Sequence, residues 1–227
     1  DSEKASMVPA VQLQNLTREA RLLNAQNAVL ALYCRNYWAT NGSEATQIKV
    51  AEESTEHHMV HVEFARTMAR AAVSAIQRVE DRPRLDRFLA ARDAARQRHG
   101  SKWDDETMER WLFFMESDGD SVERAVTSMS GAFRNRSGDA AKYGNGIYWA
   151  REATYVDDLL QARGGLKAMV MARVVVGAVM PGRPNLKPPY IKLKNGKQRE
   201  VDTLVDSTDE PLTFVIPTEE RVYPAYV

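Results

Sequence analysis

Residues 143–150, with the sequence YGNGIYWA, are the most informative stretch of this chain. Gly144 and Gly146 allow the backbone to turn tightly or to approach a ligand closely. The rings of Tyr143, Tyr148 and Trp149 offer flat faces for stacking. The stretch therefore predicts a tight turn that leads into a short strand, at a corner of the core or beside a pocket for a flat heterocycle. As a nucleotide fingerprint the glycine pair is weak, because the third glycine is missing.

Outward from this stretch, hydrophobic periodicity and turn signals predict mainly helices first and mainly strands afterwards. The expected helices cover residues 10–39, 55–72, 82–98, 120–129 and 152–162. The expected strands cover residues 73–79, 111–115, 147–150, 168–179, 200–206, 212–216 and 221–227. This order predicts an α+β fold with a mainly antiparallel sheet.

Composition narrows the function classes. The 227 residues carry 31 Lys and Arg against 31 Asp and Glu, so no overall basic footprint favours nucleic-acid binding. The single cysteine, Cys34, excludes an internal disulfide framework and a Cys-rich zinc site. It fits a reducing compartment, and we expect an intracellular protein, nuclear or cytoplasmic. No apolar stretch has the roughly 18–20 residues that span a bilayer, so no membrane partner is expected.

Two charged clusters suggest binding. Glu53, His57 and His61 would share one face of a helix, and two His at this spacing can bind zinc. Because further ligands are missing, a polar helix face is the better interpretation, and we expect no metal site. The Arg-rich helix over residues 82–98 is most simply a solvated face, and a local RNA contact or a protein-docking surface is the alternative.

Beyond these patterns, YGNGIYWA resembles the catalytic domain of the poly(ADP-ribose) polymerase family. Further segments match that family in order: residues 54–68, 72–81, 110–114, 128–133, 171–177, 201–206 and 213–227. The resemblance implies the diphtheria-toxin-like ADP-ribosyltransferase fold, a split antiparallel β-sheet with flanking helices that binds NAD in a cleft. It covers residues 46–227 and leaves residues 1–45 as an N-terminal helical extension.

The resemblance also implies where the family's catalytic residues fall. Its His, which bonds a ribose of NAD, corresponds to Phe114, and the Gly whose backbone clamps the nicotinamide amide corresponds to Met115. Its Tyr, which stacks on nicotinamide, corresponds to Tyr148, and the Glu of its polymerising members corresponds to Thr213. The remaining family positions of the NAD cleft are Tyr143, Gly144, Tyr155 and Val156, the last in place of a Ser.

The pair His99-Gly100 is a weaker candidate for the family's His-Gly pair, because it ends a helix and lies too far before Tyr148. With Phe114 and Val156, NAD would lose hydrogen bonds, and Thr213 lacks a carboxylate. We therefore expect a catalytically inactive domain that serves as a protein-interaction or structural module and needs no cofactor. The alternatives are an NAD-dependent mono-ADP-ribosyltransferase that modifies protein or nucleic acid, and a scaffold of a larger assembly whose old cleft is filled by Phe114 and Met115.

Overall fold

The structure is a computed structural model. It describes residue 38 and residues 45–116, 119–127, 131–160, 168–187, 190–192 and 198–227. The helix expected over residues 10–39 therefore lies outside the described residues, as does nearly all of the N-terminal extension. From that extension, Trp38 packs against the hydrophobic core.

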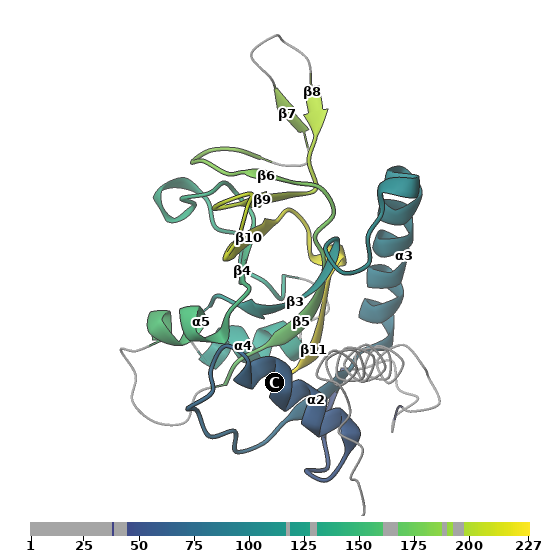
Figure 1. Ribbon diagram of the computed structural model, residues 1–227, viewed down its shortest axis with the longest axis vertical. Coiled ribbons are helices and arrows are strands. Elements are labelled where there is room, and N and C mark those ends of the chain that lie inside the picture. Colours follow the sequence, from purple (N-terminus) through teal and green to yellow (C-terminus); the bar gives the residue numbers. More distant parts are fainter. Residues whose placement is uncertain are drawn as a thin grey trace, which may run out of the picture.

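Within the described residues, nine strands form one sheet in the order β1-β2-β11-β5-β3-β4-β10-β9-β6. Neighbouring strands are antiparallel except for β6 and β9, which are parallel. Figure 1 shows β6, β9 and β10 in its upper half and β3, β5 and β11 below them. The expected α+β class with a mainly antiparallel sheet is confirmed. The strands are β1 (Thr46–Lys49), β2 (Gln77–Glu80), β3 (Glu109–Phe114), β4 (Ile147–Ala150), β5 (Met171–Val175), β6 (Val179–Pro181), β9 (Thr203–Val205), β10 (Thr213–Ile216) and β11 (Val222–Tyr226), with β7 (Tyr190–Lys192) and β8 (Gln198–Glu200) pairing separately.

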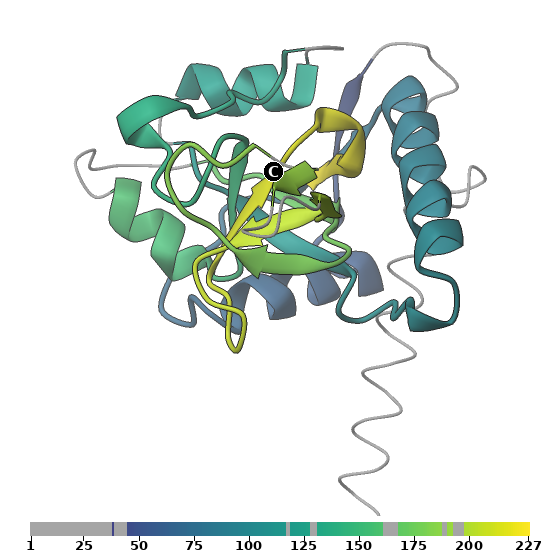
Figure 2. The ribbon, with the colours of Figure 1, turned by 90° about the horizontal axis from the view of Figure 1, so that it is seen from above.

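The helices surround this sheet. They are α2 (Thr55–Ala65), α3 (Arg82–His99), α4 (Gly119–Thr127) and α5 (Ala153–Leu160). Seen from above, α3 stands on one side of the strands, and α4 and α5 lie on the other (Figure 2). Among the described residues, none of these helices combines the length and the apolar character that a membrane crossing requires.

The side chains on the two faces of the central strands belong to two separate hydrophobic clusters. Phe113, Tyr148 and Val215 belong to the first cluster, and Leu112 and Trp149 belong to the second. Successive side chains of a strand point to opposite faces, so this division follows directly from the alternation along β3 and β4. We refer to the first as the Tyr148 face and to the second as the Trp149 face.

Several boundaries differ from those the sequence predicts, and three of them show a local backbone feature at the point of difference. Helix α2 ends at Ala65 instead of residue 72, because Arg66, Thr67 and Met68 turn back to bond carbonyls of the last turn. Strand β2 begins at Gln77 instead of residue 73, where Gln77 and Val227 exchange two backbone hydrogen bonds of 2.8 and 2.9 Å. The strand expected over residues 168–179 is divided into β5 and β6 by Gly177, whose φ is 60°.

Candidate functional site

Three adjacent strands bring the predicted catalytic positions together. Ala150 of β4 pairs with Phe113 of β3 on one side and with Thr213 of β10 on the other. Directly paired residues of antiparallel strands place their side chains on the same face. Thr213 therefore lies on the Tyr148 face, as does Val215, which pairs with Tyr148 itself. The backbone N–H of Met115 donates to the Tyr148 carbonyl at 3.2 Å, which places Met115 beside this group.

Phe114 joins this group through its backbone only. It pairs with Trp149, so its ring lies on the Trp149 face. There it contacts the rings of Phe133 and Trp149, each with a centroid separation of 5.1 Å. The scaffold alternative supposes that Phe114 fills the space beside Tyr148. The structure shows that it does not, because the Phe114 ring lies on the other face of the sheet. Met115 is beside Tyr148, and Phe113 is the buried ring of β3 on the Tyr148 face.

Tyr148 is held by hydrogen bonds to the turn that precedes it. Its hydroxyl donates to the Gly144 carbonyl at 2.8 Å and accepts from the Tyr143 N–H at 3.0 Å. Only 3% of Tyr148 is exposed, and burial raises the pKa of its hydroxyl. The phenol is therefore neutral at physiological pH, and the hydrogen bonds fix the direction of the ring.

A cation lies against the Tyr148 ring. The guanidinium carbon of Arg136 is 4.8 Å from the ring centroid, a cation–π distance. Nε of Arg136 donates to the Glu116 carboxylate at 3.2 Å, and Nη2 donates to the Met115 carbonyl. The sequence patterns did not single out Arg136. Its contacts connect residues 115–116, residue 136 and residue 148, which are separate along the chain. No local sequence pattern predicts these contacts.

The remaining cleft positions offer few polar groups. Val156 is 1% exposed and apolar, and Tyr155 and Tyr143 are partly buried against the same cluster. The Thr213 hydroxyl is buried and has no hydrogen-bond partner in the described part of the chain. The backbone N–H of Thr213 donates to Asp206 at 3.1 Å. The site thus has a buried neutral hydroxyl at the position where the resemblance places the carboxylate of the polymerising members.

His99 belongs to a different cluster. It ends α3, and its Nε2 lies 2.7 Å from an oxygen of the buried Asp202. Arg98 and Arg221 contact the same carboxylate. Burial alone would raise the pKa of Asp202, but Arg221, the Ala178 N–H and His99 outweigh it and lower that pKa. His99 therefore helps to hold α3 on the sheet and is not on β3 beside Tyr148.

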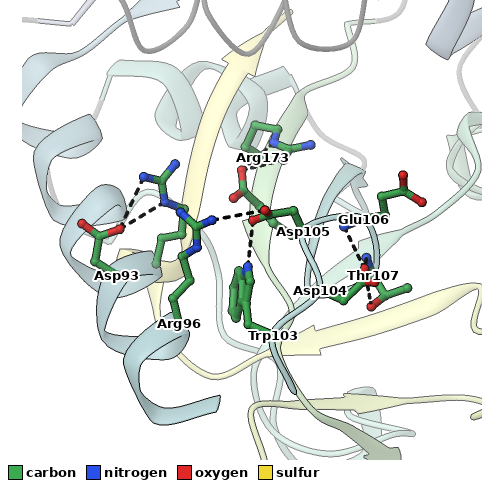
Figure 3. A network of polar contacts seen from close by, with 10 residues as sticks. Asp93, Arg96, Trp103, Asp104, Asp105, Glu106, Thr107 and Arg173 are labelled. Carbon is green, nitrogen blue, oxygen red and sulfur yellow. Dashed lines mark hydrogen bonds and ion pairs between the residues drawn. The ribbon is translucent and has the colours of Figure 1, made fainter. Parts of the chain in front are cut away.

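The arginines of α3 are largely paired with acidic residues. Arg82 bonds Asp86 at 2.9 Å, Arg92 bonds Asp93 at 3.4 Å, and Arg96 bonds Asp105 at 3.1 Å. Asp105 also accepts from the Trp103 indole at 2.7 Å, which extends the network beyond α3 (Figure 3). These pairs reduce the positive charge that the helix presents to a partner.

The histidine cluster on α2 lacks a metal-site arrangement. His57 and His61 stack with their centroids 6.3 Å apart. Among the described residues, no three His, Cys, Asp or Glu side chains gather closely enough to hold a metal ion.

Comparison with known proteins gives a consistent result. The chain is 28% identical over 183 residues to protein mono-ADP-ribosyltransferase PARP12 of Homo sapiens and 27% identical over 183 residues to that of Mus musculus. It is 26% identical over 202 residues to protein mono-ADP-ribosyltransferase PARP11 of Mus musculus. These alignments cover 79 to 80% of this chain. They cover 25% of PARP12 and 59% of PARP11. No family model matches the chain.

The relatives support the poly(ADP-ribose) polymerase catalytic-domain family. The large, mostly antiparallel sheet with few helices is consistent with the fold of that family. The chain spans only about a quarter of PARP12 and less than two thirds of PARP11, so the activities of those whole proteins do not transfer to it directly. Within the poly(ADP-ribose) polymerase framework, the group formed by Met115, Tyr148, Val156 and Thr213 is the candidate NAD cleft.

Proposed function

We propose that this chain is a catalytically inactive ADP-ribosyltransferase-like domain that acts as a protein-interaction or structural module. The observation that carries the proposal is the burial of the candidate cleft. Met115 is 5% exposed, Tyr148 3%, and Val156 and Thr213 1% each. A ligand cleft normally exposes its lining side chains to the ligand. Here, the protein's own atoms cover them.

The chemistry of these residues supports the same proposal. The resemblance assigns the clamp on the nicotinamide amide to the backbone at residue 115, but the Met115 N–H bonds Tyr148 and its carbonyl accepts from Arg136. The Met115 side chain takes space that a glycine would leave open. Val156 offers no hydroxyl, and Thr213 offers no carboxylate. The residues present therefore do not fit NAD.

The second candidate is a mono-ADP-ribosyltransferase. It is favoured by the names of PARP11 and PARP12 and by Tyr148, which retains the ring that the resemblance places against nicotinamide. If it is correct, the Tyr148→Ala variant should lose a measurable activity. The chain would then need NAD, which the inactive-domain proposal does not.

The test is label transfer from NAD. The 227-residue chain is incubated with NAD labelled on the adenylate group, in the presence and absence of candidate protein and RNA acceptors. Human protein mono-ADP-ribosyltransferase PARP12 serves as a positive control for the assay. We expect no label on the chain or on any acceptor. Transfer that Tyr148→Ala abolishes would establish the second candidate instead.

For a partner, we propose a protein surface or a larger assembly that docks on α3. The exposed positions of α3 mix both charges, including Asp86, Arg87, Asp93 and Arg96. A mixed surface suits a polar protein partner better than RNA, whose backbone favours a basic patch. Binding of single-stranded RNA that weakens steeply with salt and is lost in Arg87→Glu would favour RNA instead.

A further inference from the structure

Charged and aromatic side chains form a patch on the part of the Tyr148 face that lies on β2, β11, β5 and β3. Arg78 pairs with Tyr226, and Trp111 pairs with Arg173, so the two members of each pair share a face. Tyr226 belongs to the cluster of the Tyr148 face, and Trp111 packs against it. Residues two apart along a strand point the same way, which adds one Glu on β2 and one on β3. This Trp111 patch consists of Arg78, Glu80, Glu109, Trp111, Arg173 and Tyr226.

One half of the patch is an ion pair beside two aromatic rings. Arg173 donates two hydrogen bonds to the Glu109 carboxylate, at 2.9 and 2.6 Å. Its guanidinium carbon lies 5.0 Å from the centroid of the Trp111 ring, and the Tyr226 ring lies 5.9 Å from that of Trp111. Arg173 and Glu109 are buried, whereas Trp111 is only partly buried. This half therefore offers an aromatic surface whose charges are already paired.

The other half of the patch has more negative than positive charge. Arg78 donates to Glu80 at 2.7 Å and to Glu56 of α2 at 2.6 Å. The Tyr226 hydroxyl also donates to Glu56, at 3.0 Å. One guanidinium thus faces two carboxylates, so this group carries one net negative charge. Because buried charge is costly without compensation, a segment that covers the patch should bring positive charge together with apolar side chains.

The chain contains such a segment directly before Trp38. Trp38 packs against the same cluster as Trp111, which brings the end of the segment to this face. Residues 10–37 carry three Arg, at positions 18, 21 and 35, against one acidic residue, Glu19. The helix that the sequence predicts here would be about 40 Å long, which exceeds the roughly 15 Å across four strands. Its apolar residues are Val11, Leu13, Leu16, Leu22, Leu23, Val29, Leu30 and Leu32.

We propose that the N-terminal segment 10–37 docks on the Trp111 patch. Its leucines pack against Trp111 and Tyr226, and its arginines neutralise the carboxylates of Glu56 and Glu80. The segment is then an internal partner that shields a charged, aromatic surface from other proteins. The proposal goes beyond the proposed function, because this docking requires neither the presence nor the loss of transferase chemistry.

The test uses the full chain and its single cysteine, Cys34, which lies inside the segment. A nitroxide spin label on Cys34 measures proximity next to the Trp38 anchor. A second variant, which combines Cys34→Ser with Asn24→Cys, moves the label farther from that anchor. With either label, we expect the amide NMR signals around Trp111 on β3, β5 and β11 to lose most of their intensity and to recover when the label is reduced. The signals of β7 and β8 should not change, since that hairpin lies at the opposite end of the molecule (Figure 1).

Substitution of Trp111 checks that the patch itself holds the segment. With the label at residue 24, Trp111→Ala should restore the lost intensities, whereas Trp111→Phe, which keeps an aromatic ring, should not. Intensities that stay low in a folded Trp111→Ala chain would overturn the proposal. Should Trp111→Ala not fold, the two labels in the otherwise wild-type chain decide the question.

Two further results would overturn the proposal. Loss of signal from the label on Cys34 but not from the label at residue 24 would limit the contact to the neighbourhood of Trp38. Loss of signal in an isotope-labelled chain that is merely mixed with the spin-labelled chain would show that the segment docks on a second copy. Neither result affects the proposed function, which depends on whether the chain transfers label from NAD.

Discussion

The rings of Phe114 and Tyr148 lie on opposite faces of the sheet, although β3 and β4 are hydrogen-bonded neighbours. Phe114 pairs with Trp149, so the alternation of side chains places Phe114 in the cluster of Phe133 and Trp149. Two positions that the resemblance assigns to one NAD molecule are thus separated by the sheet itself.

Phe114→His should therefore fail to create an NAD site. An imidazole would replace a ring that is 2% exposed among apolar neighbours, and we expect the free energy of unfolding to fall by about 2–4 kcal/mol. Urea denaturation measures this loss. The apolar replacement Phe114→Leu is the control and should cost less. A gain of micromolar NAD binding by Phe114→His would contradict the assignment of Phe114 to the Trp149 face.

The Thr213 hydroxyl has no hydrogen-bond partner among the described residues, so we expect its removal to leave the free energy of unfolding unchanged or to raise it. Replacing it by a methyl group removes a buried polar atom that has no hydrogen-bond partner among the described residues, so Thr213→Val should be neutral or stabilising by up to about 1 kcal/mol. Thr203→Val is the matched control, because the buried Thr203 hydroxyl donates to the Val176 carbonyl at 2.6 Å. That variant should lose about 1 kcal/mol. Equal losses in the two variants would show that Thr213 has a partner after all.

The ion cluster at Asp202 predicts a pH-dependent contribution to stability. The pKa of Asp202 is lowered in the folded chain, so its contribution is present above the unfolded pKa of about 3.9 and is lost as the pH falls through the folded pKa. Asp202→Asn should lower the free energy of unfolding by about 3–5 kcal/mol at pH 7. The difference from the wild type should shrink below about pH 4. The exposed control Asp209→Asn should show neither effect.

Gly146 should tolerate a side chain much less than Gly138. A Cβ at Gly146 would lie 2.7 Å from the Ile216 carbonyl oxygen. The φ of 156° at this position is also one that residues with a side chain rarely adopt. Gly138 has a φ of 63° but nothing within 4 Å of an added Cβ. Gly138→Ala should cost about 1–2 kcal/mol for backbone strain alone. Gly146→Ala should cost at least about 2 kcal/mol more, and equal thermal stability of the two variants would count against the close approach at Gly146.

Regular elements with a strong local pattern were predictable from the sequence. The strand over residues 147–150 is β4 residue for residue, and α3 begins after Asp81, whose side chain accepts from the Arg84 N–H at 3.0 Å. The short edge strand β1 was missed, because Thr46–Lys49 has no apolar run and becomes a strand only by pairing with β2.

The candidate site was only partly predictable for a similar reason. A motif can identify Tyr148 and the strand ends around it, because these residues are close together along the chain. It does not reveal that the Arg136 guanidinium reaches the carbonyl of Met115, since that contact depends on how distant segments pack. Nor does a motif give the face of Phe114, which follows from strand register.

Titration calorimetry of the 227-residue chain with NAD measures whether the candidate cleft is closed to this dinucleotide. We expect no saturable heat at millimolar NAD, because the Met115 backbone groups and the Tyr148 ring are already engaged by other parts of the chain. Human protein mono-ADP-ribosyltransferase PARP12 in the same buffer provides the reference titration. A micromolar Kd for the wild-type chain, weakened by Tyr148→Ala, would show that the cleft still binds NAD and would overturn the proposal of an inactive domain.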